Sequence, residues 1–202
     1  MLLLGLLAAG LVGGCSKSEP KPPPAEVKVV EAYGVKLDAS AGPQQVVYVF
    51  LRSVADDYAA ARAKDAAAQR KAQWTTYSLA APSVIEQRLV DTANLINPNL
   101  KKTSLGDERD EKIFKAVHSW APIVGHYLPS FAKADLQTVM RESWATIGAD
   151  GQRSQVYYPV SHDPTLEPAK TQTATIDVEL VRQVPQAGGP ELWRIASLRF
   201  LG

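Results

Sequence analysis

The sequence lacks most of the residues from which catalytic and metal sites are built. Its 202 residues include one cysteine, Cys15, which excludes an intrachain disulfide, a cysteine-based zinc site and a CxxC redox pair. The three histidines, His118, His126 and His162, miss the i, i+4 spacing that brings two metal ligands to one helix face. No GxSxG, Walker-type or GxGxxG motif occurs. We therefore predict no catalytic residue, no metal and no cofactor, with structural or solvated roles for the histidines.

An excess of charge of either sign is also missing. The 22 basic and 21 acidic residues leave a formal net charge of +1 at pH 7, and no basic stripe stands out. Nucleic acid is therefore not an expected partner, and neither is a membrane bound through charge alone. A hydrophobic fraction of 46% and a charged fraction of 21% are typical of a globular protein, and the length predicts one domain with a real core.

The first 14 residues, MLLLGLLAAGLVGG, form an uncharged apolar run. The run is too short to cross a bilayer, which needs roughly 20 helical residues, and it fits the apolar region of a secretory signal. It ends in Val12-Gly13-Gly14-Cys15, which resembles the bacterial lipobox: an aliphatic residue, two small residues and a cysteine. The resemblance implies cleavage between Gly14 and Cys15, lipidation of the Cys15 thiol and acylation of the new amino terminus. An ordinary cleaved signal, or an apolar tail on a cytoplasmic protein, is the alternative.

A proline-rich segment follows the cysteine, with the sequence SKSEPKPPPA. Its prolines favour an extended polyproline conformation, which at about 3.1 Å per residue would hold a domain roughly 30 Å from the bilayer. Ser16 stands where an aspartate would resemble an inner-membrane retention signal, so we expect the periplasmic face of the outer membrane. The chain thus divides into a signal (residues 1–14), a lipidated cysteine with its tether (15–25) and one domain (26–202).

The first half of the domain has mostly helical periodicity. A β-prone stretch covers residues 26–38. Apolar residues every four positions from Val46 then predict a helix from Pro43 towards Lys71, and a second helix is expected from Pro82 to before Pro98. After a polar loop, Ser104 and Asp107 resemble a capping box, and a third helix follows that Pro122 kinks or restarts; its apolar positions are Ile113, Phe114, Val117 and Trp120.

The second half alternates with a period of two. We predict strands over residues 136–147, 155–160, 173–182 and 192–201. In the third of these, Asp177 and Glu179 share the face opposite the apolar residues, and we expect that face to be solvated. Helices followed by consecutive antiparallel strands predict an α+β fold, with N-terminal helices packed on a curved, mostly antiparallel sheet.

This order of elements, with a closing hairpin that carries Trp193-Arg194-Ile195, resembles the nuclear transport factor 2-like (ketosteroid-isomerase-like) superfamily over Gln44–Gly202. The resemblance implies a cone-shaped cavity on the concave side of the sheet. We place Trp144, Tyr157 and Tyr158 there as candidate ligand contacts, and we expect all four tryptophans, at positions 74, 120, 144 and 193, to lie in the core or at a cavity mouth. Enzymes of this superfamily use a carboxylate and a tyrosine, which Asp177, Glu179 and the two tyrosines could supply.

Three functions remain open. The favoured one is a non-catalytic binding or interaction module of the cell envelope, tethered through Cys15, whose partner is another envelope protein or a small apolar ligand. The second is a cavity enzyme of the isomerase or dehydratase type, which needs a buried carboxylate beside a tyrosine in a pocket. The third is a structural lipoprotein that braces an envelope assembly, which needs an exposed apolar patch.

Overall fold

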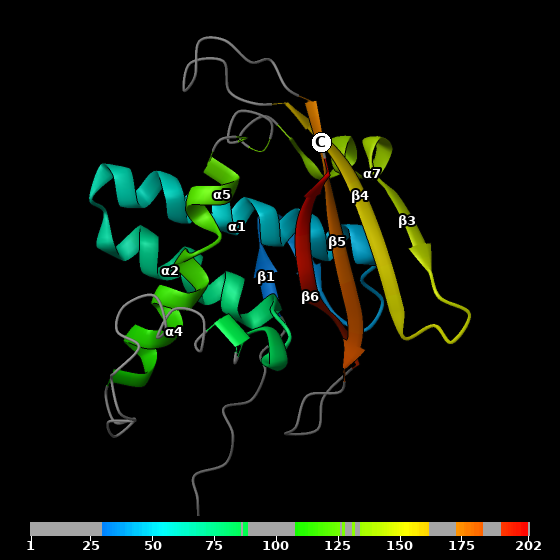
Figure 1. Ribbon diagram of the computed structural model, residues 1–202, viewed down its shortest axis with the longest axis horizontal. Coiled ribbons are helices and arrows are strands. Elements are labelled where there is room, and N and C mark those ends of the chain that lie inside the picture. Colours follow the sequence, from blue (N-terminus) through cyan, green and yellow to red (C-terminus); the bar gives the residue numbers. More distant parts are fainter. Residues whose placement is uncertain are drawn as a thin grey trace, which may run out of the picture.

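The computed structural model describes residues 30–85, 87–88, 108–125, 127, 131, 134–161, 173–183 and 191–201. They form an α+β fold in which helices pack on an antiparallel sheet of four strands, as the sequence predicts (Figure 1). The signal, Cys15, the tether, His126, His162 and the Ser104–Asp107 pair lie outside the described residues.

The described chain begins with a small hairpin where one β-prone stretch was expected. Strands β1 (Val30–Ala32) and β2 (Val35–Leu37) are antiparallel and joined by Tyr33 and Gly34, whose φ angles are 54° and 73°. Positive φ at both central residues is the geometry of a two-residue type I′ turn, which matches the twist of the flanking strands. The hairpin buries Val35 and Leu37 beside helix α1.

The predicted helix from Pro43 towards Lys71 is two helices. Helix α1 (Pro43–Ala63) ends at Lys64, whose left-handed conformation has a φ of 58°, and α2 (Ala66–Leu79) runs back along it. The Asp65 carboxylate caps α2 by accepting a hydrogen bond from the backbone N–H of Ala68 at 3.0 Å. The alanine-rich pattern hides this break, because it favours helix on both sides of the turn.

The other helices are shorter. The third predicted helix is observed as two helices, α4 (Glu108–His118) and α5 (Ala121–Gly125). The second of them begins beside Pro122, where a kink or restart was expected. Residues 82–85 are helical, and most of the remainder of the second predicted helix lies outside the described residues. The strand predicted from Leu136 was wrong, because α7 (Leu136–Glu142) occupies its first half. Asp135 explains this, since its side chain accepts from the Thr138 N–H at 2.7 Å and so caps the helix.

The sheet is a meander in the order β3–β4–β5–β6. The strands are β3 (Trp144–Ile147), β4 (Arg153–Ser161), β5 (Thr173–Gln183) and β6 (Leu192–Leu201), and the last three confirm the predicted ranges. Strand β3 forms one edge. At the other edge, Ala80 bridges β6 at Ile195, and the Ala81 N–H donates to the Ile195 carbonyl at 2.8 Å.

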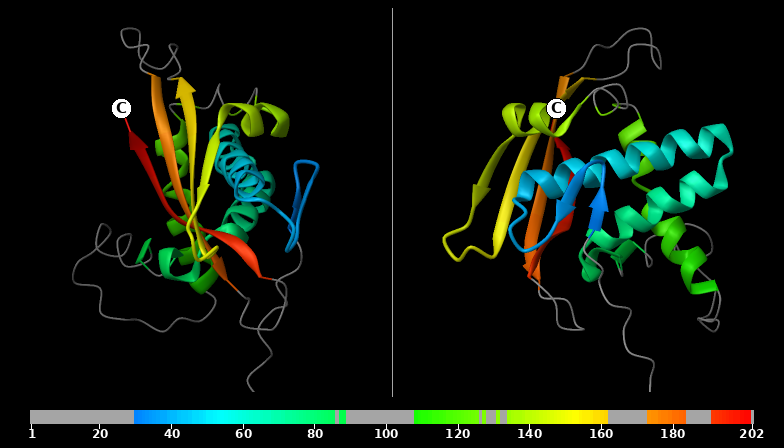
Figure 2. Two further views of the ribbon diagram at one scale, coloured as in Figure 1. Left: turned by 90° about the vertical axis from the view of Figure 1, so that its right-hand side faces the viewer. Right: turned by 180° about the vertical axis from the view of Figure 1, so that it is seen from behind.

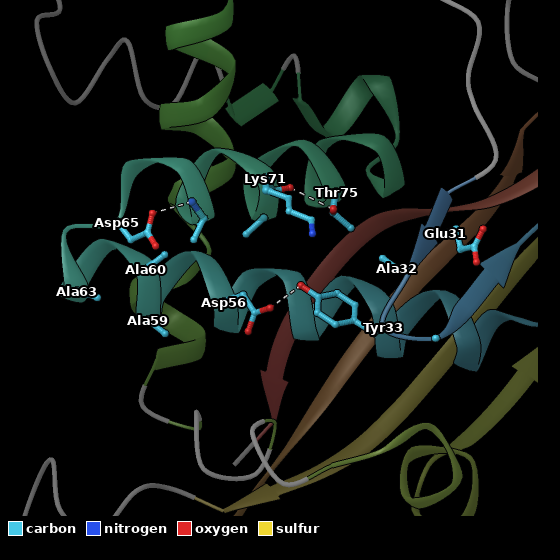
Figure 3. Close-up of a pocket in the computed structure, with 13 residues that line it drawn as sticks. Glu31, Ala32, Tyr33, Asp56, Ala59, Ala60, Ala63, Asp65, Lys71 and Thr75 are labelled. Carbon is cyan, nitrogen blue, oxygen red and sulfur yellow. Dashed lines mark hydrogen bonds between the residues drawn. The ribbon is translucent and has the colours of Figure 1, made fainter.

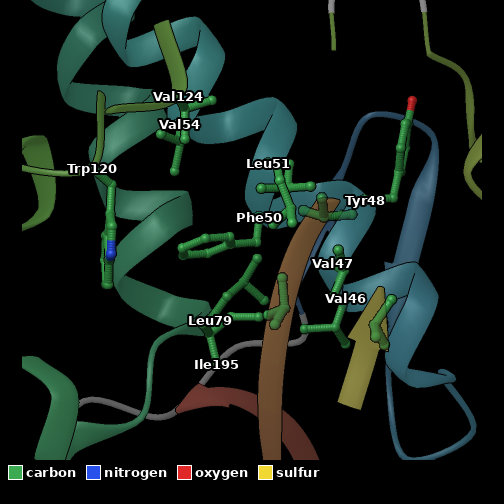
Figure 4. Close-up of a cluster of buried hydrophobic side chains, with 14 of the residues drawn as sticks. Val46, Val47, Tyr48, Phe50, Leu51, Val54, Leu79, Trp120, Val124 and Ile195 are labelled. Atoms are coloured by element: carbon green, nitrogen blue, oxygen red, sulfur yellow. The ribbon is translucent and has the colours of Figure 1, made fainter. Parts of the chain in front are cut away.

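The core lies between α1 and the inner face of the sheet (Figure 4). Phe50 stands at its centre and meets Trp120 edge-on, with ring centroids 5.1 Å apart. A β-bulge at the Glu179/Leu180 step resets the alternation of β6, so that Ile195 pairs with Leu180 on the inner face. Ile195 and Leu198 are three positions apart, and because of the bulge both pack in or against this core. The buried side chains that the sheet contributes are Val156, Tyr158, Val160, Ala174, Ile176, Val178, Leu180, Trp193 and Ile195.

Candidate functional site

The sheet face turned away from the helices carries one continuous row of four side chains. Strand register pairs Trp144 with Tyr157, Tyr157 with Asp177, and Asp177 with Arg199. In Figure 1, α1 crosses behind β5 and β6, and none of the labelled helices lies in front of the sheet; the turned views of Figure 2 agree. The two ends of this row, Trp144 and Arg199, are exposed.

Two aromatic rings form one end of the row. Trp144 is 53% exposed, and its ring stacks on that of Tyr157 with centroids 5.2 Å apart and planes 18° from parallel. Tyr158 is the next residue along β4, so it points to the opposite face and is buried in the core. The structure thus brings together two of the three predicted ligand residues and separates the third.

A carboxylate and a guanidinium form the other end. Asp177 is 3% exposed, although the sequence predicts a solvated position for it. Its cross-strand neighbours, Tyr157 and Arg199, are both large and limit the access of solvent to it. Arg199 donates from Nη2 to Oδ2 of Asp177 at 2.7 Å, while Oδ1 is buried with no hydrogen-bond partner. A buried acceptor without a donor costs about 1–3 kcal/mol, so the pair with Arg199 satisfies only part of this carboxylate.

A second row on the same face is wholly polar. It consists of Thr146, Gln155, Glu179 and Ser197, which are cross-strand partners of one another in that order. Tyr157 donates its hydroxyl to Oε1 of Gln155 at 3.0 Å, and Ser197 donates to Glu179 at 3.4 Å. We call the eight side chains of these two rows the outer face. Each can hydrogen-bond. The next row on this side of the sheet begins with the exposed Arg153, so the two carboxylates are balanced by two guanidiniums.

A groove lies between α1, α2 and the hairpin (Figure 3). This groove has a volume of about 710 Å³ and is lined largely by alanines. Tyr33 donates to Asp56 across its mouth at 2.8 Å, and burial together with this bond raises the pKa of Tyr33 far above its usual value. The Asp65 carboxylate accepts a hydrogen bond from the Ala68 N–H, and the Thr75 hydroxyl donates one to the backbone carbonyl of Lys71. The hydroxyls and two of the carboxylates at this groove thus already have partners within the protein, and no exposed aromatic ring pair lies among the described residues that line it. We therefore take the outer face as the candidate site.

A buried polar contact joins three helices. Asp57 on α1 is 1% exposed; its Oδ1 accepts from Gln73 of α2 at 3.1 Å, and its Oδ2 lies 2.9 Å from Nδ1 of His118 at the end of α4. The sequence predicts a structural role for His118, and this geometry is consistent with one. The sequence does not reveal that Asp57 is the partner of His118, because the two residues are 61 positions apart.

This contact makes stability depend on pH. The hydrogen bond to Asp57 raises the pKa of His118 above its ordinary value of about 6.5, with burial opposing it. A raised folded-state pKa means that the stabilisation is complete below pH ~6.5 and is lost as the pH rises through the folded pKa. We expect the urea midpoint to fall between pH 6 and pH 9, and to fall less in His118→Gln. Equal pH slopes in both proteins would contradict this account.

The described residues hold no group of three or more histidine, cysteine or acidic side chains that could ligate a metal, and none of their helices is long and apolar enough to span a bilayer. Asp177 does lie beside a tyrosine, as the enzyme hypothesis requires. Its Oδ2, however, already accepts a hydrogen bond from Arg199. Comparison with family models, curated proteins and solved structures finds no match to this chain.

Proposed function

We propose that this protein is a non-catalytic binding module of the bacterial cell envelope, tethered by lipid on Cys15, whose outer face receives the ligand. The observation that carries the proposal is the exposed Trp144–Tyr157 stack beside the Asp177–Arg199 pair. Tryptophan, tyrosine and arginine dominate the energetics of binding surfaces, because each offers a large area with a polar handle. Trp144 adds little to the core while more than half of it stays exposed, so a role in binding accounts better for its position.

The anchor is part of the proposal and rests on the lipobox resemblance and the tether. It favours the periplasmic face of the outer membrane, where a domain held roughly 30 Å away by a stiff spacer can reach ligands beyond the lipid headgroups. A brace for an assembly would need a broad apolar patch, whereas the outer face carries three charged groups among its eight side chains.

Replacing Cys15 with serine should abolish membrane attachment. The serine hydroxyl cannot form the thioether that carries the diacylglycerol, so the variant lacks the lipid chains that stable anchoring needs. We expect Cys15→Ser to lose incorporation of labelled palmitate and to move from the detergent phase to the aqueous phase in Triton X-114 partitioning. Ser18→Ala is the matched control and should behave as the natural sequence. Unchanged partitioning of Cys15→Ser would refute the anchor.

Photo-crosslinking tests the binding surface directly. The photoreactive residue p-benzoylphenylalanine is placed at position 144 and, as a control, at position 74, because Trp74 is 45% exposed but lies on α2. Irradiation of intact cells should give a discrete adduct, of protein or of glycan, from position 144 and not from position 74. No adduct from position 144, or the same adduct from both, would refute the outer face as the binding surface.

A further inference from the structure

We infer that the ligand of the outer face is an uncharged carbohydrate, a β-linked chain of pyranose rings that lies across the four strands. This inference rests on the proposed function and names the class of ligand. It starts from Trp144, whose exposed ring is already fixed in orientation by its stack on Tyr157. The face of an aromatic ring carries partial negative charge, so it attracts the C–H groups on the flat side of a sugar ring.

The hydrogen-bonding groups beside this platform suit hydroxyls. Glu179 accepts from Ser197 through Oε2, which leaves its Oε1 to accept. Gln155 accepts from Tyr157 through Oε1, which leaves its amide N–H groups to donate. Arg199 uses Nη2 on Asp177, and its side chain is 58% exposed, so its other N–H groups can turn to a ligand. A sugar hydroxyl both donates and accepts, and can therefore serve an acceptor and a donor in one row.

The charges of the face also bear on the class of ligand. Two carboxylates and, with the exposed Arg153, two guanidiniums leave this side of the sheet without an excess of either sign, so it offers no patch of one charge for phosphate groups, nucleic acids or anionic lipids. A protein partner with an apolar interface core is also a poor fit, because the carboxylates of Asp177 and Glu179 occupy the middle of the rows. Interface cores are depleted of such charges. An uncharged polyol with flat apolar faces meets both conditions.

The dimensions favour a chain over a single sugar. Four neighbouring strands with gaps of about 4.8 Å give a row roughly 14 Å long, from the indole of Trp144 to the guanidinium of Arg199. A pyranose with equatorial substituents stacks through its flat side and directs its hydroxyls outward. Successive rings of a β-linked chain can then contact the aromatic end and the charged end together.

The test is titration of the mature lipoprotein, held in an uncharged polyoxyethylene detergent that contains no sugar. Cellohexaose, chitohexaose and maltohexaose are the probes, followed by saturation-transfer NMR and calorimetry. We expect binding of a β-linked probe, a loss of about tenfold or more in affinity for Trp144→Ala, and a change within about twofold for Trp74→Ala. Arg199→Ala, a change at an exposed side chain, should also weaken binding and provides a second variant if Trp144→Ala folds poorly.

Each alternative result has a definite meaning. If none of the three oligosaccharides binds, the carbohydrate inference is overturned, while a protein adduct from position 144 in cells would still uphold the proposed function. If a sugar binds but both Trp144→Ala and Arg199→Ala bind it as tightly, a site elsewhere is responsible and the inference is overturned. If maltohexaose alone binds, the β-linked geometry is wrong.

Discussion

Replacing Phe50 with alanine should lower the free energy of unfolding by about 3–5 kcal/mol, the usual cost of a buried phenylalanine. The Phe50 side chain is fully buried where α1 crosses the sheet, with Trp120 edge-on against it. Its removal takes apolar contacts from both layers and leaves a cavity that neither α1 nor the sheet can close without moving. Urea denaturation, with the slope and the midpoint fitted together, measures the loss.

Met140→Ala is the control for this change. Met140 lies on α7 and is 45% exposed, so the same kind of truncation should cost less than about 1 kcal/mol. A Phe50→Ala protein as stable as Met140→Ala would show that the interface between α1 and the sheet does not hold the two layers together.

Replacing Asp57 with alanine is expected to cost about 2–4 kcal/mol, the second largest effect. The Gln73 amide and the His118 imidazole would lose the acceptor they share, and Gln73 is itself buried. Asp56→Ala is a matched control at the next position, because Asp56 is exposed and only meets Tyr33; we expect a loss below about 1 kcal/mol. Thermal unfolding of the two variants separates the predictions, and equal losses would contradict a structural role for the buried contact.

The regular elements of the fold could be predicted from the sequence, and their irregular junctions could not. The alternation from Ala174 to Leu180 predicts that one face of β5 is buried. Apolar residues at every fourth position predict the helix α1. The break between α1 and α2 was not predicted, because it depends on the left-handed residue Lys64 and the cap Asp65 inside a run of good helix formers. Helix α7 was predicted as a strand, because its apolar residues also fit an alternating pattern.

The site was predictable in part. The sequence pointed to Trp144 and Tyr157 by residue type, and the strict alternation of β4 already separates Tyr157 from Tyr158. The partnership of Asp177 with Arg199 could not be foreseen, because it depends on the register between β5 and β6 and on the bulge that shifts it. Burial of Asp177 follows from its neighbours in space, which the pattern along one strand does not contain.

The two edges of the sheet differ in how readily they could pair with another molecule. The bridge of Ala80 to Ile195 covers part of the β6 edge, whereas β3 is an edge strand that pairs only with β4 among the described strands. An incoming strand from a neighbouring molecule would therefore add most readily at β3, beside Trp144. Strand β3 has four residues, so such an addition could form few backbone hydrogen bonds. Its short length thus keeps neighbouring copies of this protein from joining sheet to sheet.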